Sequence, residues 1–340
     1  MTIVDTISQL EKELECDSRV IIEVKIVESN YPLKKAYELS FVSLEHFLAF
    51  EVTLKLSDGS ERVAEVVPLL GYSSESPEYI LDYLKDKARK LQGHTLSKAR
   101  ALVTPDVEKT PFSTTALLTA IDSFFIESLE TQPDTSFCIP TSSKKIHDTI
   151  SIIEGLERRE TIKLKLSGNY DLDSSAIKAL ESDTRNLQHR YRLDANQAYK
   201  LDDAYRFFSF LGKSELLSQI DYVEQPLAAG NWDGHGQILK DFPDIPIMLD
   251  ESIVTNAEVV RAHDMGIPFI KLKLFKQGGI LELLKTTRLA NELGMGVILG
   301  NGVATQTSNK VEIDLFHRFS KLYQAPLEAN GFLKISTVQF

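Results

Sequence analysis

The sequence is poor in the residues that build covalent or soft-metal frameworks. Only two cysteines, Cys16 and Cys138, occur in 340 residues, too few for a disulfide framework or a cysteine-rich zinc site. The seven histidines are scattered and show no HxxH or HExxH spacing, so a metal site built from histidines is not expected. Scarce cysteine without a pairing pattern favours a reducing, cytosolic compartment.

Long apolar runs and an excess of basic residues are also missing. No apolar run approaches the roughly 18 residues that a membrane-spanning helix needs. Residues 1–19 carry Asp5, Glu11, Glu13 and Glu15, unlike the basic start of a signal peptide. The net charge of −11 gives no general attraction to nucleic acid or to an anionic membrane. We therefore expect a cytoplasmic protein whose partners include neither nucleic acid nor membrane.

The composition is that of a folded protein with a large core. Apolar residues make up 43% and charged residues 26% of a chain long enough for one large domain or two domains. Alternating apolar residues over Ile21–Val27 and Phe47–Leu56 predict strands. The Ser76-Pro77 pair predicts the start of one helix, and Ser113–Leu129 has the apolar spacing of another. Residues 1–135 are therefore expected to form an α+β domain.

Short apolar runs alternate with amphipathic helices from about residue 136 onward. This alternation predicts parallel strands with helices outside them, and seven or eight such units fit a closed (β/α) barrel. A doubly wound open sheet is the alternative, but no GxGxxG or GxxxxGK[ST] motif supports a nucleotide-binding version. The predicted strands are Ser136–Pro140, Ile162–Leu166, Tyr191–Asp194, Tyr222–Val223, Ile245–Leu249, Phe269–Leu274, Val297–Leu299 and, more weakly, Ala325–Phe332.

Polar motifs recur at the carboxyl ends of these predicted strands, 23 to 30 residues apart. They are Lys163-Leu164-Lys165, Asp194-Ala195-Asn196, Glu224-Gln225-Pro226, Asp250-Glu251 and Lys271-Leu272-Lys273. Each motif alone is ordinary, because Lys-x-Lys is common on solvated strand edges and Asp-x-Asn is common in turns. Five of them in order, one per strand–helix unit, predict a common site at the face where barrel active sites lie.

The charges of these motifs suggest a cation site flanked by proton carriers. Asp194, Glu224 and Asp250 would repel one another unless a cation lay between them, and hard oxygen ligands favour Mg²⁺ or Mn²⁺ over zinc. The lysines on either side are candidates for acid/base work, because an ammonium beside another ammonium and a divalent cation loses its proton more readily.

The motif set resembles the enolase superfamily, and more narrowly its muconate lactonizing enzyme subgroup. That subgroup includes dipeptide epimerases, N-acylamino acid racemases and o-succinylbenzoate synthases. The resemblance rests on Ile162–Lys165, Arg192–Gln197, Val223–Pro226, Pro246–Ser252 and Ile270–Ile280, while Pro32–Ala36 and Ala64–Pro68 are similar to the N-terminal capping domain. The implied fold class is α/β: a TIM-like (β/α) barrel over residues 136–340 and an α+β capping domain over residues 1–135.

The resemblance also implies a role for each motif. The implied ligands of Mg²⁺, with Mn²⁺ as the alternative metal, are Asp194, Glu224 and Asp250. Lys165 and Lys273 would act as acid/base catalysts on opposite faces of the substrate, and Lys163 would tune Lys165 and touch the substrate carboxylate. Residues 296–302 contain no histidine, which favours a lysine pair over the histidine base of the mandelate racemase branch.

The substrate contacts are the least determined part of the resemblance. The predicted contacts are Asn196, Glu251, Asn301, Glu328 and Asn330. A glutamate frequent on the family's seventh strand is absent from residues 300–304. The Asp-x-Asp with which dipeptide epimerases often hold the substrate ammonium is matched only by Glu328-Ala329-Asn330. Residues 31–41 and 69–74 of the capping domain are candidates for loops over the barrel mouth.

The implied activity is a Mg²⁺-dependent racemase or epimerase. It would abstract the proton α to a carboxylate through an enediolate intermediate, and its substrate would be a small-molecule carboxylate, either a dipeptide or an N-acyl amino acid. One alternative is a lyase or cycloisomerase of the same subgroup, of the o-succinylbenzoate synthase or muconate cycloisomerase type. Another is a non-catalytic metal-binding barrel. The sequence leaves a homo-oligomer open.

Overall fold

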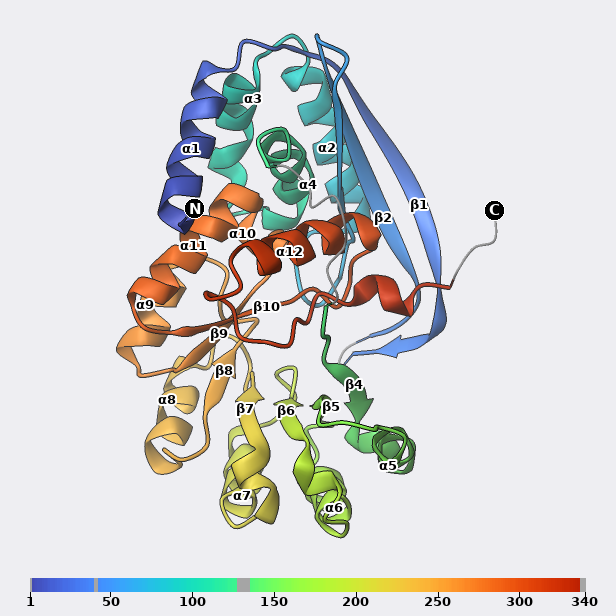
Figure 1. Ribbon diagram of the computed structural model, residues 1–340, viewed down its shortest axis with the longest axis vertical. Helices are drawn as coiled ribbons and strands as arrows, with labels where there is room; N and C mark the ends of the chain where they lie inside the picture. The colour runs from blue at the N-terminus through green and yellow to red at the C-terminus, as the bar shows by residue number, and fades with distance from the viewer. Residues whose placement is uncertain (1, 40–41, 127–134, 337–340) are drawn as a thin grey trace. The chain divides into compact units, whose positions relative to one another are not determined.

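The protein is described by a computed structural model that covers residues 2–39, 42–126 and 135–336 (Figure 1). The chain divides into two compact units. Unit 1 comprises Met1–Thr135, Val254–Asn256 and Leu272–Phe340, and unit 2 comprises Ser136–Ile253 and Ala257–Lys271. Residues 272–340, which the sequence assigned to the second domain, therefore cluster with residues 1–135. The division into a capping domain and a barrel domain stays a prediction.

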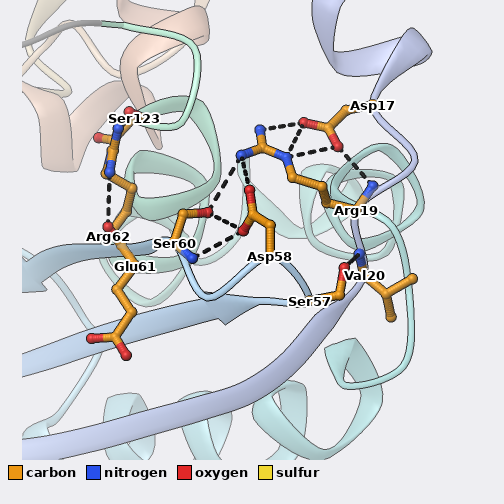
Figure 2. Close-up of polar contacts among 9 residues, drawn as sticks. All are labelled: Asp17, Arg19, Val20, Ser57, Asp58, Ser60, Glu61, Arg62 and Ser123. Atoms are coloured by element: carbon orange, nitrogen blue, oxygen red, sulfur yellow. Dashed lines mark hydrogen bonds and ion pairs between the residues drawn. The ribbon is translucent and has the colours of Figure 1, made fainter.

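Unit 1 begins with a helix and a three-stranded antiparallel sheet. The elements are α1 (Ile3–Cys16), β1 (Ile21–Glu38), β2 (Ser43–Leu56) and β3 (Glu61–Val66), with the strand order β1-β2-β3. Asp58 closes the turn between β2 and β3, because its carboxylate accepts a hydrogen bond from the backbone N–H of Ser60 at 2.9 Å. Arg19 donates from Nη1 to the same carboxylate at 3.2 Å, which ties the start of β1 to this turn (Figure 2).

Three helices of unit 1 pack with this sheet around one hydrophobic core. They are α2 (Pro77–Leu91), α3 (Leu96–Val103) and α4 (Pro111–Asp122). The start of α2 is as predicted: Ser76 accepts a hydrogen bond from the N–H of Tyr79 at 3.2 Å, and proline follows at the first helical position. Every residue of α4 after Pro111 is buried, and the core holds side chains such as Phe50, Leu84 and Leu117.

The helix predicted over residues 113–129 differs from α4 at both ends. It begins two residues earlier and ends at Asp122, and residues 127–134 lie outside the described residues. The prediction extended the helix through Phe124 and Phe125, which pack against the core from beyond the helix end. Apolar periodicity marks a helix only while one face is solvated, so it could not locate the end of a helix that is buried all round.

The later part of unit 1 contains helices, one strand and a short 3₁₀ segment. These elements are α10 (Leu274–Gln277), α11 (Ile280–Glu292), β10 (Gly296–Leu299), α12 (Gln306–Arg318) and the 3₁₀ turn Gly331–Lys334. The N–H of Gly300, directly after β10, donates to the carbonyl of Leu272 at 3.0 Å. The N-terminus of α12 is tied to β3, because the buried carboxylate of Glu65 accepts from the N–H groups of Thr305 and Ser308.

Unit 2 is built from repeated strand–helix pairs. Its strands are β4 (Ile139–Ser142), β5 (Thr161–Lys165), β6 (Arg190–Asp194), β7 (Ile220–Glu224), β8 (Ile247–Leu249) and β9 (Phe269–Leu272), whose last residue begins a segment of unit 1. The helices between them are α5 (Ile146–Glu154), α6 (Tyr170–Glu181), α7 (Leu201–Leu211), α8 (Trp232–Asp241) and α9 (Asn256–Asp264). The strands pair in chain order and every pair is parallel.

The predicted fold class is confirmed: the protein is α/β, with a curled parallel sheet and an N-terminal antiparallel sheet. A doubly wound sheet would reverse its strand order at a switch point, whereas the order from β4 to β9 is sequential. The eighth predicted strand, residues 325–332, is wrong. In that described segment Glu328 makes one isolated bridge, to Gly300, and residues from Gly331 onward form the 3₁₀ turn. Among the described residues no helix has the length and apolar character of a membrane span.

Gly279 provides a test of how tightly α11 is set against α4. Its φ of 144° is unfavourable for a residue with a side chain, and an added Cβ would lie 2.8 Å from Leu118 Cβ. We expect Gly279→Ala to lower the free energy of unfolding by about 1–3 kcal/mol from backbone strain alone, measured by urea denaturation. The matched control is Gly155→Ala, because Gly155 has a φ of −81° and its nearest neighbour would be at 3.5 Å. Equal effects of the two substitutions would show that α11 tolerates a side chain at this point.

Candidate active site

The predicted motifs lie at the carboxyl ends of successive strands. β5 ends at Lys165, β6 at Asp194 and β7 at Glu224, while Asp250 follows the last residue of β8. The strand register pairs Lys165 with Asp194 and Asp194 with Glu224. Parallel strands present their carboxyl ends at one edge of the sheet, so unit 2 brings these side chains to one edge, as the spacing predicted.

The most buried charge of this edge is the Glu224 carboxylate, which contacts two ammonium groups. Lys163 Nζ lies 2.6 Å from Glu224 Oε2 and 3.0 Å from Asp194 Oδ2, and Lys271 Nζ lies 2.6 Å from Glu224 Oε1. The side chain of Glu224 is 1% exposed and that of Lys271 is 3% exposed. Two buried carboxylates are thus balanced by two ammonium groups, which offsets the cost of removing all four from water.

The ionisation of Asp194 follows from these contacts. Burial opposes its charged form, but the positive charges of Lys163, Lys165 and Lys271 outweigh burial, so the pKa of Asp194 lies below its ordinary value. Asp194 is therefore held as a carboxylate. The sequence indicates Lys271 only as part of a motif and not as a site residue. Its signal is the two-residue period of a strand, which places the side chains of Lys271 and Lys273 on the same face.

Lys165 lies among polar groups that the sequence predicted as substrate contacts. Its Nζ donates to Asn196 Oδ1 at 2.8 Å, and the other end of that amide, Nδ2, donates to Glu251 Oε1 at 3.4 Å. The N–H of Asn196 donates to Asp194 Oδ1 at 3.1 Å. Asn196 has a φ of 43°, an uncommon conformation that Asn tolerates better than most residues. Unit 2 therefore brings Lys165, Asn196 and Glu251 together.

Gln225 fixes the segment that carries Asp250, and sequence reasoning assigned it no role. Its Oε1 accepts from the N–H groups of Asp250 at 3.0 Å and Ser252 at 3.1 Å. Its Nε2 donates to Ser252 Oγ at 2.8 Å, and the residue is fully buried with a φ of 38°. Gln225 thus holds the chain after β8 from the end of β7. The Glu-Gln-Pro motif signalled a site but not this contact.

The loop after Lys165 is held in a similar way by Asp173. This fully buried carboxylate accepts from the N–H groups of Ser167 at 2.8 Å and Gly168 at 3.0 Å, and from the hydroxyl of Tyr199 at 2.6 Å. Gly168 has a φ of 77°, and a Cβ there would meet Ala198 at 2.5 Å. The loops that follow β5 and β6 are therefore pressed together, which limits the movement of the chain on which Lys165 lies.

The other predicted site residues belong to unit 1. The backbone N–H of Lys273 donates to Gln277 Oε1 at 2.8 Å, and its Nζ donates to Tyr72 Oη at 3.1 Å. The N–H of Asn301 donates to the carbonyl of Glu328 at 3.3 Å. Asn330 Oδ1 accepts from Lys334 Nζ at 2.8 Å. Asn301, Glu328 and Asn330 are all buried. The β-bridge between Gly300, which follows β10, and Glu328 brings the segments of Asn301 and Asn330 together.

Glu312 is a buried carboxyl group near Lys273 that the sequence did not indicate. Glu312 on α12 is fully buried, and burial raises its pKa to about 8. Asn309 Nδ2 donates to Glu312 Oε2 at 3.0 Å, and the N–H of Leu274, next to Lys273, points to Oε1 at 3.5 Å. At neutral pH the group is therefore mainly protonated. A charged residue within an ordinary amphipathic helix pattern carries no sign of such burial.

The donor set suits a hard divalent cation by its chemistry. Asp194, Glu224 and Asp250 are buried carboxylates from three consecutive strand ends, and carboxylate oxygen is the ligand that Mg²⁺ prefers. In the part of the chain that the structure describes, however, no three His, Cys, Asp or Glu side chains are grouped closely enough to hold a metal ion. Lys163 contacts Asp194 and Glu224, and Lys271 contacts Glu224. The metal site thus stays a prediction.

The chain is similar to known proteins in sequence and in fold. The family described as Enolase C-terminal domain-like matches residues 154–324. An L-Ala-D/L-Glu epimerase from Francisella tularensis subsp. novicida is 27% identical over 301 residues, 82% of each chain. Muconate cycloisomerase 1 from Pseudomonas putida is 25% identical over 323 residues, 84% of this chain and 82% of the relative. A dipeptide epimerase from Cytophaga hutchinsonii was solved with Mg and the dipeptide D-Ala-L-Val. Its structure matches this one with a TM-score of 0.80 at 20% identity, and the match covers 94% of this chain and 89% of the epimerase chain.

The fold and the strand ends define an α/β protein of the barrel class with charged side chains at one edge of its parallel sheet. The family match extends over half of the chain. The chain belongs to the Enolase C-terminal domain-like family of the enolase superfamily. The prediction of an enzyme of the isomerase kind in this superfamily is confirmed at that level. The structural likeness confirms the fold.

The ion pairs of Glu224 lead to a stability prediction. We expect Lys271→Met to lower the free energy of unfolding by about 3 kcal/mol in the presence of a chelator, because the buried carboxylate of Glu224 loses an ammonium partner. The control is Lys90→Met, whose pair with Asp86 lies on the surface and should matter by less than about 1 kcal/mol. Chemical denaturation measures both. A Lys271→Met variant as stable as the control would show that the pair contributes nothing.

Proposed function

We propose that this protein is a Mg²⁺-dependent epimerase or racemase that inverts the carbon next to a carboxylate in a dipeptide or an N-acyl amino acid. The observation that carries the proposal is the position of two lysines directly at strand ends: Lys165 is the last residue of β5, and Lys273 follows β9. The relatives named L-Ala-D/L-Glu epimerase and dipeptide epimerase support the reaction class. Dipeptides of the L-Ala-Glu type are therefore the first substrates to test.

In the proposed reaction each lysine carries out one proton transfer. Lys165, as the neutral amine, removes the α-proton from one face and becomes an ammonium, while Lys273 donates a proton to the opposite face. The reverse reaction exchanges these roles. The hydrogen bond from Lys165 Nζ to Asn196 Oδ1 directs the nitrogen. Such positioning matters because proton transfer needs the two heavy atoms within about 3 Å.

The carboxylates have the proposed role of metal ligands. Asp194, Glu224 and Asp250 would hold Mg²⁺, with Mn²⁺ as the alternative, and Gln225 would keep Asp250 in place. When bound, the metal supplies positive charge that offsets the negative charge gained by the substrate carboxylate as its α-proton leaves. Lys163, which contacts two of these carboxylates, would also tune Lys165 and touch the substrate carboxylate.

The proposed substrate contacts fall into two groups. Asn196 and Glu251 lie beside Lys165. Asn301, Glu328 and Asn330 offer amide and carboxylate oxygens at the ends of later segments. Amide oxygens and carboxylates accept hydrogen bonds, so both groups suit the N–H donors of a peptide or acylamino substrate.

A second candidate is a cycloisomerase or lyase of the same subgroup. The observation in its favour is the resemblance to muconate cycloisomerase 1 over most of both chains. In that reaction only one lysine would transfer a proton, and the other would stabilise charge. The two candidates therefore predict different patterns of α-proton exchange.

Exchange in D₂O tests the proposed function. With L-Ala-L-Glu and L-Ala-D-Glu as substrates, the wild-type protein should incorporate deuterium at the glutamate α-carbon and interconvert the two. Lys273→Ala should stop interconversion but keep exchange of one epimer through Lys165, and Lys165→Ala should keep exchange of the other. Loss of a general base typically costs about 10²–10⁴-fold, so the surviving exchange is easy to separate by NMR.

Three outcomes would contradict the epimerase. Equal loss of exchange for both epimers in both variants would exclude the two-base reaction. Loss of water or ring formation from other acids, without exchange from two faces, would favour the lyase or cycloisomerase. Absence of all turnover, with Mg²⁺ still bound, would favour the non-catalytic barrel. A screen of hydrophobic dipeptides and N-acyl amino acids extends the test to the other substrates of the proposal.

The ligand assignment has its own test. Asp250→Asn should weaken Mg²⁺ binding by about tenfold or more, because one anionic ligand becomes neutral. Isothermal calorimetry measures the affinity without any substrate. The control is Asp233→Asn, because Asp233 is an exposed residue of α8, and this variant should bind Mg²⁺ like the wild type. An unchanged affinity in the Asp250→Asn variant would remove Asp250 from the ligand set.

A further inference from the structure

Lys273 lies against an aromatic side chain that comes from a distant loop. Its Nζ donates to Tyr72 Oη at 3.1 Å and lies 4.7 Å from the centroid of the Tyr72 ring. The Phe275 ring is 5.6 Å from the same nitrogen. The ammonium is therefore in contact with a hydroxyl dipole and two π-systems, both of which attract a cation.

The ring of Tyr72 has little freedom to move. It packs edge-on against Phe275, with centroids 5.6 Å apart and an interplanar angle of 82°, and against Phe112 at 6.3 Å. Phe112 and Phe275 are themselves 4.4 Å apart. Edge-to-face and tilted contacts at these distances are the favourable arrangements of aromatic pairs. The position of the hydroxyl is thus set by three rings together.

The loop that carries Tyr72 is fastened to the start of α4. Glu75, which is 3% exposed, accepts from the N–H groups of Phe112 at 3.0 Å and Ser113 at 2.8 Å, and from the Ser113 hydroxyl. A carboxylate at a helix N-terminus satisfies N–H groups that have no partner within the helix. The sequence indicated residues 69–74 as a loop over the barrel mouth. The structure shows this segment held at Glu75.

We propose that Tyr72 is a positioning residue for Lys273, and that Glu75 and the Phe112–Phe275 pair hold it in that role. The inference rests on the proposed function. A lysine side chain loses considerable rotamer freedom when it is ordered, and Gln277 holds the backbone of Lys273. The hydroxyl and ring of Tyr72 give the Nζ atom a fixed location. A proton-transfer group needs a fixed position, because misplacement by about 1 Å can lower the reaction rate about 100-fold.

The two faces of the substrate provide an internal test. In the Lys165→Ala background, exchange of one L-Ala-Glu epimer in D₂O reports on Lys273 alone; in the Lys273→Ala background, exchange of the other reports on Lys165 alone. Tyr72→Phe should slow the first exchange about tenfold, the usual effect of a lost hydrogen bond to a charged group. The second exchange should stay within about twofold, and KM should change little in either background. Tyr72→Leu should slow the first exchange further because it also removes the ring.

The control is Tyr83→Phe, which removes the hydroxyl that donates to Asp106 at 2.9 Å. It should leave both exchange reactions unchanged. Slowing of both exchanges by Tyr72→Phe, an effect on KM alone, or no effect would overturn the proposal. If neither parent variant exchanges protons, the proposed function has failed, and a readout that needs no substrate decides about Tyr72.

That readout is the rate at which acetic anhydride modifies Lys273, compared with Lys165 in the same sample by peptide mass spectrometry. In the wild-type protein Tyr72 covers the Lys273 ammonium, so Tyr72→Leu should raise the modification ratio severalfold. Tyr83→Leu should not. An unchanged ratio in the Tyr72→Leu variant would show that Tyr72 does not hold Lys273, whatever the protein's reaction is.

Discussion

The carboxylate of Glu224, buried between two ammonium groups, is the constraint on which the polar edge of unit 2 depends. A buried ion without partners costs several kcal/mol, so Lys163 on β5 and Lys271 on β9 have to reach the end of β7. Both lysines reach Glu224 only if the register of the strands places the carboxyl ends of β5, β7 and β9 at the same edge of the sheet. The register that pairs Lys165 with Asp194 and Asp194 with Glu224 meets this requirement, and it also determines where Lys165 lies.

Much of this edge could be predicted because it depends on short-range regularities. Side chains two residues apart share a face of a strand, so Lys-x-Lys could be interpreted as paired lysines. Spacing by one strand–helix unit brings successive strand ends together. The same regularities failed for residues 325–332, where Glu328 meets Gly300 through a single bridge and not through a strand. They also failed at the end of α4, where every residue after Pro111 is buried.

The contacts that hold the functional side chains could not be predicted, because they join residues far apart in the chain. Tyr72 and Lys273 are separated by 201 positions and Glu65 and Thr305 by 240. Gln225 is closer to its partners, but its effect depends on a φ of 38° that no motif reveals. Sequence pattern identifies charged strand ends; the supporting groups follow from how loops meet once the strands are in place.

The two lysines at the centre of the proposed function are held by different chemistry. Lys165 contacts an amide oxygen that is itself linked to Glu251, so it lies in a chain of hydrogen bonds. Lys273 contacts a phenol and aromatic rings, so a hydroxyl dipole and π-systems act on its ammonium. Amide and carboxylate groups respond to the charge of a nearby ammonium more strongly than rings do. In a reaction in which one lysine removes a proton and the other donates one, the two lysines would therefore be held by different contacts.

The same difference between the two lysines would also serve a one-base reaction, in which Lys165 moves the proton and Lys273 keeps its charge. The structure thus supplies two distinct supports, and the use that the reaction makes of them is what separates an epimerase from a cycloisomerase.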